Sequence, residues 1–339
     1  MLKNDHDLLY RNVEIEKLRK KHFFITGATG FLGLNLLESL VQLNQEFQLE
    51  MELTLLVRDQ SRAAQLLARY GISSKSINFL ESDLLNFLGV PYEYPEYDCI
   101  FHLAANTNLV DLREHPERGA KVIIEGTRNV LKLSTHSGCK NFIYLSSGAV
   151  YGKQLSDLSK IDEAASLDHG PLTSDMYGSS KVIAEQDCLQ WSSEHGLKTT
   201  ILRGFAFGGP HLNLDAHYAI GSLLQSAMKG DPIVVQDGAT LRSYLYSVDA
   251  IIWILKAAFS EHPSHIFNLG SDQAVTIESL AQKISDQTGN KNIEIISRST
   301  SPNRYVPNVD LAKKELGVGV YTTLDQIIHQ MFEWNKQKP

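Results

Sequence analysis

The sequence predicts an α/β fold in which a doubly wound, mostly parallel β-sheet is joined by a smaller α/β lobe at the C-terminal end. Three observations predict it: short apolar runs alternate with longer helical patterns, the runs lack strict polar–apolar alternation, and a glycine-rich turn links the first run to a helical pattern. Continuous apolar runs are typical of strands buried on both faces of a helix-covered sheet. The 339 residues suffice for two lobes that share a core.

The elements of the larger lobe follow one another in a regular order. Residues 7–21 carry apolar side chains spaced among charges, which predicts a short amphipathic helix. Strands are then expected at His22–Thr26, Leu53–Val57, Ser76–Leu80, Cys99–Leu103, Asn141–Leu145 and Thr199–Leu202. Helices are expected between them at 31–45, 59–70, 115–137 and 176–195. Alternating strands and helices of this kind form parallel sheets.

The pattern changes after residue 205, where loops lengthen and Gly–Pro turns appear. Helices are expected at 217–229, 248–260, 276–288, 308–316 and 323–334. We therefore divide the chain into an N-terminal helical extension at 1–21, a larger lobe at 22–205 and a smaller lobe at 206–339. The last boundary is interleaved, since strands near 245 and 267 are able to rejoin the larger lobe.

Composition narrows the class of protein. No stretch approaches the ~20 apolar residues that span a bilayer, and the N-terminus lacks the apolar core of a secretion signal, so we expect a cytoplasmic protein without a membrane segment. The three cysteines show no C-x-x-C spacing, which indicates neither a disulfide framework nor a metal site. The net charge of −7 argues against a nucleic acid partner.

The turn after the first strand reads Gly27-Ala28-Thr29-Gly30-Phe31-Leu32-Gly33. Glycines permit a tight turn and a close approach of backbone to a pyrophosphate, and the following helix offers N–H groups and a positive dipole end. A glycine-rich turn without a ligand is the alternative, but the strand before and the helix after favour a Rossmann-type dinucleotide site. We expect cofactor contacts from Gly27, Thr29, Gly30, Phe31, Leu32 and Gly33.

The ends of the second and third strands bear on the choice of cofactor. Arg58 stands where a cation accommodates the 2′-phosphate of NADP, whereas an acid there selects NAD. We therefore favour NADP(H) and keep NAD(H) as the alternative, and Arg58 is otherwise a solvated surface residue. Asp83, followed by Leu84, either accepts a hydrogen bond from the adenine amino group or caps a helix.

Tyr177 and Lys181 open the helix at 176–195, four residues apart and thus on one helical face. A phenol with an ordinary pKa of ~10 is a poor base near neutrality, but an ammonium group beside it favours the phenolate. Tyr177 can then exchange a proton with a carbinol or ketone while hydride moves to or from a nicotinamide. The fifth strand leads into Ser146 and Ser147, either of which can polarise the substrate oxygen or cap a backbone turn.

These motifs occur in one order along the chain: G27-A-T-G-F-L-G33, D83-L, F101-H-L-A-A105, S146-S-G-A-V-Y-G152, Y177-x-x-x-K181, L202-R and R242-S-Y-L-Y-S-V-D249. The set resembles the extended short-chain dehydrogenase/reductase family, in the branch of nucleotide-sugar epimerases, dehydratases and ketoreductases. The resemblance covers about residues 20–335 and implies an NAD(P)-dependent enzyme.

By that resemblance, particular residues acquire expected roles. Ser147, Tyr177 and Lys181 are the implied catalytic residues, and Lys181 also hydrogen-bonds the nicotinamide ribose. The cofactor is expected to be lined in addition by Leu103, Ala104, Ala105 and Phe205. The nucleotide-sugar substrate is expected to contact Thr107, Ser147, Arg242 and Arg304, with Arg242 on the diphosphate. The helices at 115–137 and 176–195 form a homodimer contact in relatives, and packing within the monomer is the alternative.

Departures from the family pattern narrow the expected reaction. The 4,6-dehydratases carry Asp-Glu directly after the catalytic hydroxyl, where this chain has Gly148 and Ala149, and the Glu that sugar-acid decarboxylases use nearby is also absent. What remains is hydride chemistry at one carbinol carbon. We expect an NADPH-dependent reductase of a nucleotide-linked 4-keto-6-deoxy sugar. The alternatives are a 4-epimerase that retains NAD and, in another class, a non-catalytic dinucleotide-binding redox sensor.

Overall fold

The computed structural model describes residues 3–105, 114–154, 158–165, 167, 176–216, 218–261 and 265–337. In this part of the chain, seven parallel strands form the central sheet in the order β11-β6-β5-β4-β1-β2-β3. The strands are β1 (His22–Thr26), β2 (Glu52–Val57), β3 (Ile77–Glu81), β4 (Cys99–His102), β5 (Asn141–Ser147), β6 (Lys198–Gly204) and β11 (His265–Leu269). The strand order reverses between β1 and β4, so the predicted doubly wound Rossmann-type sheet is confirmed.

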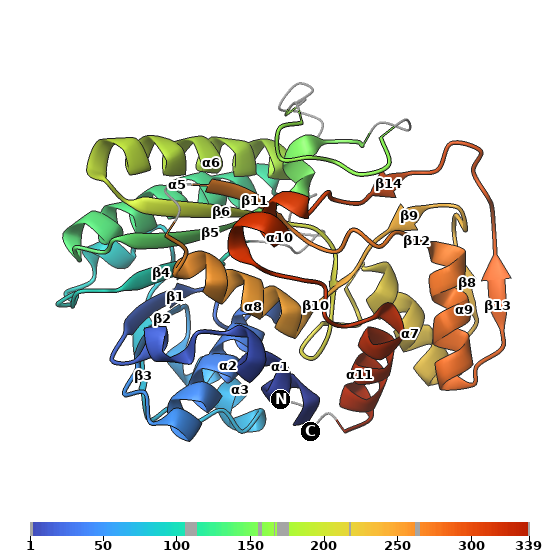
Figure 1. Ribbon diagram of the computed structural model, residues 1–339, viewed down its shortest axis with the longest axis horizontal. Coiled ribbons are helices and arrows are strands. Elements are labelled where there is room, and N and C mark those ends of the chain that lie inside the picture. Colours follow the sequence, from blue (N-terminus) through green and yellow to red (C-terminus); the bar gives the residue numbers. More distant parts are fainter. Residues whose placement is uncertain are drawn as a thin grey trace.

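Helices cover both faces of this sheet. Figure 1 shows α5 (Pro116–His136) and α6 (Met176–His195) over one face, and α2 (Phe31–Phe47), α3 (Gln60–Arg69) and α8 (Ser247–Ala258) over the other. The strands are buried on both sides because successive side chains point to opposite faces. Phe24 packs into the core beneath α5 and α6, whereas its neighbours Phe23 and Ile25 pack into the core beneath α2 and α8.

The smaller lobe is built from helices and short strand pairs. Its helices are α7 (Ala219–Lys229), α9 (Ile277–Thr288), α10 (Asp310–Leu316) and α11 (Leu324–Gln337). Its strands pair as β7 (Phe207–Gly208) with β10 (Leu245–Tyr246), as β8 (Ile233–Val235) with β13 (Ile293–Ile295), and as β9 (Leu241–Arg242) with both β12 (Val275–Thr276) and β14 (Arg304–Tyr305). The strand expected near 267 joins the central sheet as β11, whereas the strand near 245 pairs with β7 instead.

The N-terminal helix expected at 7–21 is wrong in its extent. The chain forms α1 (Lys3–Asn12), followed by a separate 3-10 turn, η1 (Ile15–Leu18). Leu9 and Leu18 are both fully buried in the same core. In a continuous helix, with about 100° per residue, these two side chains would point to opposite faces. The break between α1 and η1 turns Leu18 back toward the core that Leu9 enters.

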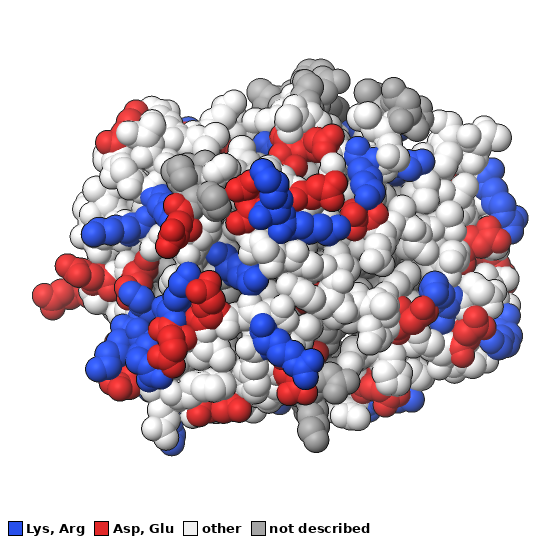
Figure 2. Space-filling view, in the orientation of Figure 1, with Lys and Arg blue, Asp and Glu red and all other residues white. Residues whose placement is uncertain are grey.

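The described residues contain neither a membrane-spanning helix nor a cluster of metal ligands. No helix among them is long and apolar enough to cross a membrane, and they contain no group of three or more His, Cys, Asp or Glu side chains that could hold a metal ion. The cysteines at 99, 139 and 188 are free and buried. Figure 2 shows Lys and Arg side chains interspersed with Asp and Glu on the face that it presents.

Candidate active site

The glycine turn connects β1 to α2 and is closely packed on its inner side. Gly27 has a φ of +74°, and a Cβ atom there would lie 2.6 Å from the backbone nitrogen of Ala104. A Cβ atom on Gly33 would lie 2.0 Å from the carbonyl oxygen of Gly27. Side chains are therefore excluded at both positions, and the start of α2 approaches the turn closely.

The outer side of the same turn is open. Thr29 and Gly30 are exposed, and Gly30 is the N-cap residue of α2. The helix N-terminus therefore presents backbone N–H groups and the positive end of its dipole toward exposed backbone, which suits a pyrophosphate. The residues present thus fit the dinucleotide that the sequence predicts.

Beside the turn, a buried chain of hydrogen bonds joins β1, β4 and α5. The Nδ1 atom of His102 lies 2.7 Å from Thr26 Oγ1, and its Nε2 atom lies 3.0 Å from Thr127 Oγ1. Burial lowers the pKa of His102 to about 3, with the nearby Lys181 charge acting in the same direction. The imidazole is therefore neutral and holds the strand ends that carry the glycine turn. Ala104, whose N–H donates to Thr26 Oγ1 at 3.3 Å, is fixed by the same chain.

The residues expected to select the cofactor lie at the carboxyl ends of β2 and β3. Arg58 directly follows β2 and is exposed. The Asp59 carboxylate accepts the N–H of Arg62 at 2.8 Å as the N-cap of α3. The Asp83 carboxylate accepts the N–H groups of Leu85 and Asn86 and so caps a turn after β3. It is not the expected helix N-cap, because that position of the following 3-10 helix is Asn86. Its adenine contact remains a prediction.

Lys181 is buried beneath the start of α6. Only 1% of its surface is exposed, and its Nζ atom donates a hydrogen bond of 2.7 Å to the carbonyl of Leu145 and lies 4.6 Å from the centre of the Tyr144 ring. Burial lowers the pKa of Lys181 to about 8, and the Glu185 carboxylate acts in the opposite direction. Tyr177 lies one turn earlier on α6 and is partly exposed.

The two adjacent serines at the end of β5 point into different surroundings. Ser146 is 4% exposed, and its hydroxyl donates to Glu185 at 2.5 Å. Ser147 is half-buried at the strand end, where its hydroxyl accepts the N–H of Ala149 at 3.1 Å. The sequence left open which of the two serines can polarise a substrate oxygen. In the structure, Ser146 is held in the interior, whereas Ser147 lies at the edge of the sheet.

A residue of the smaller lobe, which sequence reasoning missed, lies beside the end of β5. The Tyr305 hydroxyl of β14 donates to the carbonyl of Gly204, the register partner of Ser147, at 3.4 Å. Burial raises the pKa of Tyr305, while the nearby Ser147 side chain acts in the opposite direction. The Tyr305 ring stacks on Phe205 with 4.5 Å between ring centroids. A Cβ atom on Gly148 would lie 2.6 Å from the Tyr305 hydroxyl and 2.9 Å from the Phe205 ring. A side chain at position 148 would therefore require Tyr305 or Phe205 to shift.

The remaining predicted substrate residues lie on the neighbouring strands of the smaller lobe. Arg242 on β9 is the register partner of Tyr305, and burial lowers its pKa. The side chains of these two partners lie on the same face of the strand pair. Arg304 precedes Tyr305, and its Nη1 atom donates to the carbonyl of Ser159 at 3.3 Å. Thr107 lies outside the described residues.

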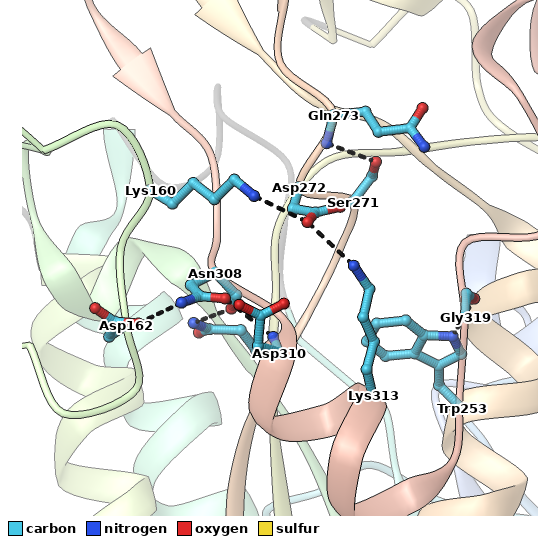
Figure 3. A network of polar contacts seen from close by, with 11 residues as sticks. Lys160, Asp162, Trp253, Ser271, Asp272, Gln273, Asn308, Asp310, Lys313 and Gly319 are labelled. Carbon is cyan, nitrogen blue, oxygen red and sulfur yellow. Dashed lines mark hydrogen bonds and ion pairs between the residues drawn. The ribbon is translucent and has the colours of Figure 1, made fainter.

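Between Ser147 and Tyr177 in the sequence, residues 158–163 form ion pairs and hydrogen bonds with the smaller lobe. Figure 3 shows Asp272 between Lys160 and Lys313, with Nζ–Oδ2 distances of 2.9 and 3.1 Å. In the same view, the Asn308 amide donates to Asp162 at 2.7 Å. We call residues 158–163 the strap. Because the strap contacts both the segment after β14 and the segment after β11, it fixes the smaller lobe beside the end of β5.

The chain is similar in sequence to proteins of known function. The sequence profile described as "NAD dependent epimerase/dehydratase family" matches residues 23–270. A trifunctional UDP-glucose 4,6-dehydratase/UDP-4-keto-6-deoxy-D-glucose 3,5-epimerase/UDP-4-keto-L-rhamnose-reductase of Arabidopsis thaliana is 26% identical over 95% of this chain, which spans 48% of that relative's length. The UDP-N-acetyl-alpha-D-glucosaminuronate decarboxylase of Bacillus cytotoxicus is 28% identical over 79% of this chain and 81% of its own.

A solved structure shares the fold over nearly its whole length. The UDP-glucuronic acid 4-epimerase of Bacillus cereus, in complex with UDP-glucuronic acid and NAD, superposes with a TM-score of 0.75 at 18% identity. The match covers 93% of this chain and 99% of that one. The likeness is thus one of fold.

Proposed function

This chain belongs to the NAD dependent epimerase/dehydratase family, and on that premise we propose that it reduces a nucleotide-diphosphate-linked 4-keto-6-deoxy sugar with NADPH. The chain spans about half the length of the trifunctional plant relative. The activity, substrate and partners proposed below are therefore those of the present chain alone.

One observation carries the proposal: Ser147, Tyr177 and Lys181 lie at one end of the sheet, and the two residues after Ser147 carry no carboxylate. Position 148 holds glycine, and any side chain there would have to displace the Tyr305 hydroxyl and the Phe205 ring. Position 149 holds alanine. Removing water from the sugar ring requires acid–base groups next to the reacting carbon. The arrangement therefore favours hydride and proton transfer at one carbon over elimination.

The chain's own residues supply the proton and the polarisation. When bound, the nicotinamide supplies a hydride to the carbonyl carbon. Ser147 donates a hydrogen bond to the substrate carbonyl oxygen, and Tyr177 delivers the proton that turns this oxygen into a hydroxyl. The Lys181 ammonium stabilises the phenolate that remains on Tyr177, and a proton from solvent restores the phenol. Hydride and proton together reduce one ketone to one alcohol.

The preference for NADPH rests on Arg58. Its exposed position directly after β2 suits a cation that pairs with the 2′-phosphate of the adenosine ribose. Phosphate recognition by a guanidinium is bidentate and charge-assisted. Substrate contacts are proposed for Arg242, on the diphosphate, and for Thr107 and Arg304.

A 4-epimerase that retains NAD is the second candidate. It is supported by the shared fold with the Bacillus cereus 4-epimerase and by the same set of serine, tyrosine and lysine, since oxidation followed by reduction at one carbon needs no carboxylate. The two candidates differ in cofactor balance, because an epimerase consumes none and a reductase consumes one NADPH for each alcohol formed.

We further propose a homodimer formed through α5 and α6. Leu189 on α6 is 37% exposed and Trp191 is partly exposed on the same helix. Apolar side chains at a helix surface are typical of a helix–helix interface. Gel filtration with light scattering measures the mass: a dimer supports this assembly, and a monomer contradicts it.

The proposed reaction is tested by incubating the protein with NADPH and 4-keto-6-deoxy sugars linked to UDP, dTDP, CDP or GDP. A reductase consumes NADPH and forms an equal amount of alcohol with at least one of them. Interconversion of 4-epimers without net cofactor consumption would favour the second candidate. No turnover in either assay, together with no thermal stabilisation by any nucleotide sugar, would contradict both.

A further inference from the structure

Helix α6 carries a third polar side chain in line with the proposed catalytic pair. Tyr177, Lys181 and Glu185 are spaced by four residues and lie on one helical face. Lys181 donates to the carbonyl of Leu145 at 2.7 Å, and Glu185 accepts the Ser146 hydroxyl at 2.5 Å. Two successive turns of α6 thus hold two successive residues of β5, and the next residue of that strand is Ser147.

The Glu185 carboxylate is paired with an arginine on the neighbouring strand. The Nη2 atom of Arg203 on β6 lies 2.7 Å from Glu185 Oε2, and its Nε atom lies 3.1 Å from Oε1. Both residues are 2% exposed. A buried carboxylate without such a partner would be costly and would take up a proton. Arg203 is also the register partner of Ser146, so the ion pair lies beside the last residues of β5.

The ion pair continues into a buried network that reaches the strap and β11. Arg203 Nη1 donates to the Tyr151 hydroxyl at 2.9 Å and to the carbonyl of Glu163 at 3.1 Å. Tyr151 in turn donates to the Asn268 side chain at 2.7 Å. The network therefore joins α6 and the end of β5 to the elements that position Tyr305.

We propose that Glu185 is a positioning residue for the reaction, whose carboxylate holds the end of β5 beneath Ser147 and supplies the counter-charge of the buried Lys181 ammonium, while Arg203 holds that carboxylate in place. The inference rests on the proposed function, since it gives Lys181 and Ser147 their roles.

The groups around Lys181 support this assignment of charge. The neutral His102 of β4 and the Tyr144 ring of β5 face it, and burial raises the pKa of the Cys188 thiol of α6 well above its ordinary value. Burial lowers the pKa of Lys181 to about 8, and the negative charge of Glu185 acts in the opposite direction by favouring the ammonium. Facing Glu185 itself are Arg203, Ser146 and Tyr151. Without the carboxylate, the ammonium would be lost at lower pH.

The substitution Glu185→Gln removes the charge and keeps an amide oxygen that can accept the Ser146 hydroxyl. We expect the pH at which kcat falls to move down by roughly one unit. At pH 8, kcat should fall about fivefold while the KM for the sugar changes by less than about threefold. The Kd of NADPH, followed by nicotinamide fluorescence at each pH, should weaken at the same lowered pH because Lys181 is expected to contact the cofactor.

A double variant separates positioning from folding. Glu185→Gln leaves Arg203 buried without its partner, which destabilises the fold, whereas Glu185→Gln with Arg203→Met removes both charges and restores stability. If Glu185 supplies the counter-charge, both pH shifts persist in the stable double variant. If the pair serves only folding, the double variant regains the wild-type pH profile, and the inference is overturned.

A matched control uses an exposed ion pair of the same kind. Arg298 contacts Glu278 through Nε and Nη2 at 2.7 and 2.8 Å, with both side chains exposed to solvent. Glu278→Gln should leave both pH profiles unchanged, and an equal shift there would overturn the inference. If wild-type protein turns over no nucleotide sugar, the proposed function fails, while the pH dependence of NADPH binding in the Glu185 variants still decides this inference.

Discussion

The hydroxyl oxygen of Tyr305 lies 2.6 Å from the place that a Cβ atom on Gly148 would occupy. The two residues come from different lobes, and Ser147 directly precedes Gly148. The residue type at position 148, directly after β5, therefore depends on how the smaller lobe packs against it. Any side chain at position 148 would have to displace Tyr305 or Phe205, so glycine is the residue that fits there without rearrangement.

Replacing that glycine tests the contact. Gly148→Ala should displace Tyr305 or Phe205, destabilise the fold by about 1–3 kcal/mol through overpacking, and lower kcat/KM more than tenfold, a rough estimate for a misplaced reacting group. Thermal unfolding and steady-state rates measure the two effects. Gly89→Ala is the matched control, since no atom lies within 4 Å of a Cβ there. Wild-type activity in Gly148→Ala would contradict the assigned contact.

Tyr177→Phe removes only the hydroxyl that is proposed to deliver the proton. We expect kcat to fall by about 10²–10⁴-fold, the usual contribution of a positioned acid, while the Kd of NADPH changes little because the ring and Lys181 remain. Stopped-flow turnover and fluorescence titration measure these quantities. Turnover preserved within a few-fold would remove Tyr177 from the mechanism.

The pKa of Lys181 predicts how activity depends on pH. Burial lowers that pKa from its ordinary value to about 8, so the ammonium is present below this pH and is lost as the pH rises through it. Because the ammonium stabilises the Tyr177 phenolate, kcat/KM should fall above about pH 8. Lys181→Arg keeps its charge throughout this range. Its residual activity should lack the alkaline fall, and the same fall in this variant would exclude Lys181 as its origin.

Arg58→Ala tests the choice of cofactor. Loss of a charge-assisted contact to the 2′-phosphate should raise the KM for NADPH by about 10–100-fold, in line with about 1.5–3 kcal/mol for such a hydrogen bond. Values of kcat/KM with NADH should be unchanged, which provides the internal control. Equal losses with both cofactors would show that Arg58 does not read the phosphate.

Much of the site was predictable because its signals are local. The glycine turn, Tyr177 with Lys181, and the serines at the end of β5 are short patterns whose spacing alone sets their geometry. The apolar runs likewise predicted six strands of the parallel sheet, whereas the seventh, β11, was expected only as one of two strands able to rejoin the larger lobe.

Tyr305 and Glu185 were missed for a physical reason. Tyr305 lies beside Gly148 only because β14 pairs with β9 and the strap holds the segment after it, and neither contact leaves a local pattern. Gly148 was the available signal, since a glycine beside a functional serine indicates a close neighbour without identifying it. The break between α1 and η1 was also missed, because it depends on the position of the core that both Leu9 and Leu18 enter and not on a local sequence pattern.

The central claim is hydride transfer to one carbonyl carbon without elimination, and isotope tracing measures it most directly. NADPH deuterated at the transferred position of the nicotinamide is incubated with the nucleotide-linked 4-keto-6-deoxy sugar that the enzyme accepts. The account predicts one deuterium at C4 of the product for each NADPH consumed, with the remaining ring carbons unlabelled. Consumption of NADPH without deuterium at C4, or a product that has lost water, would contradict it.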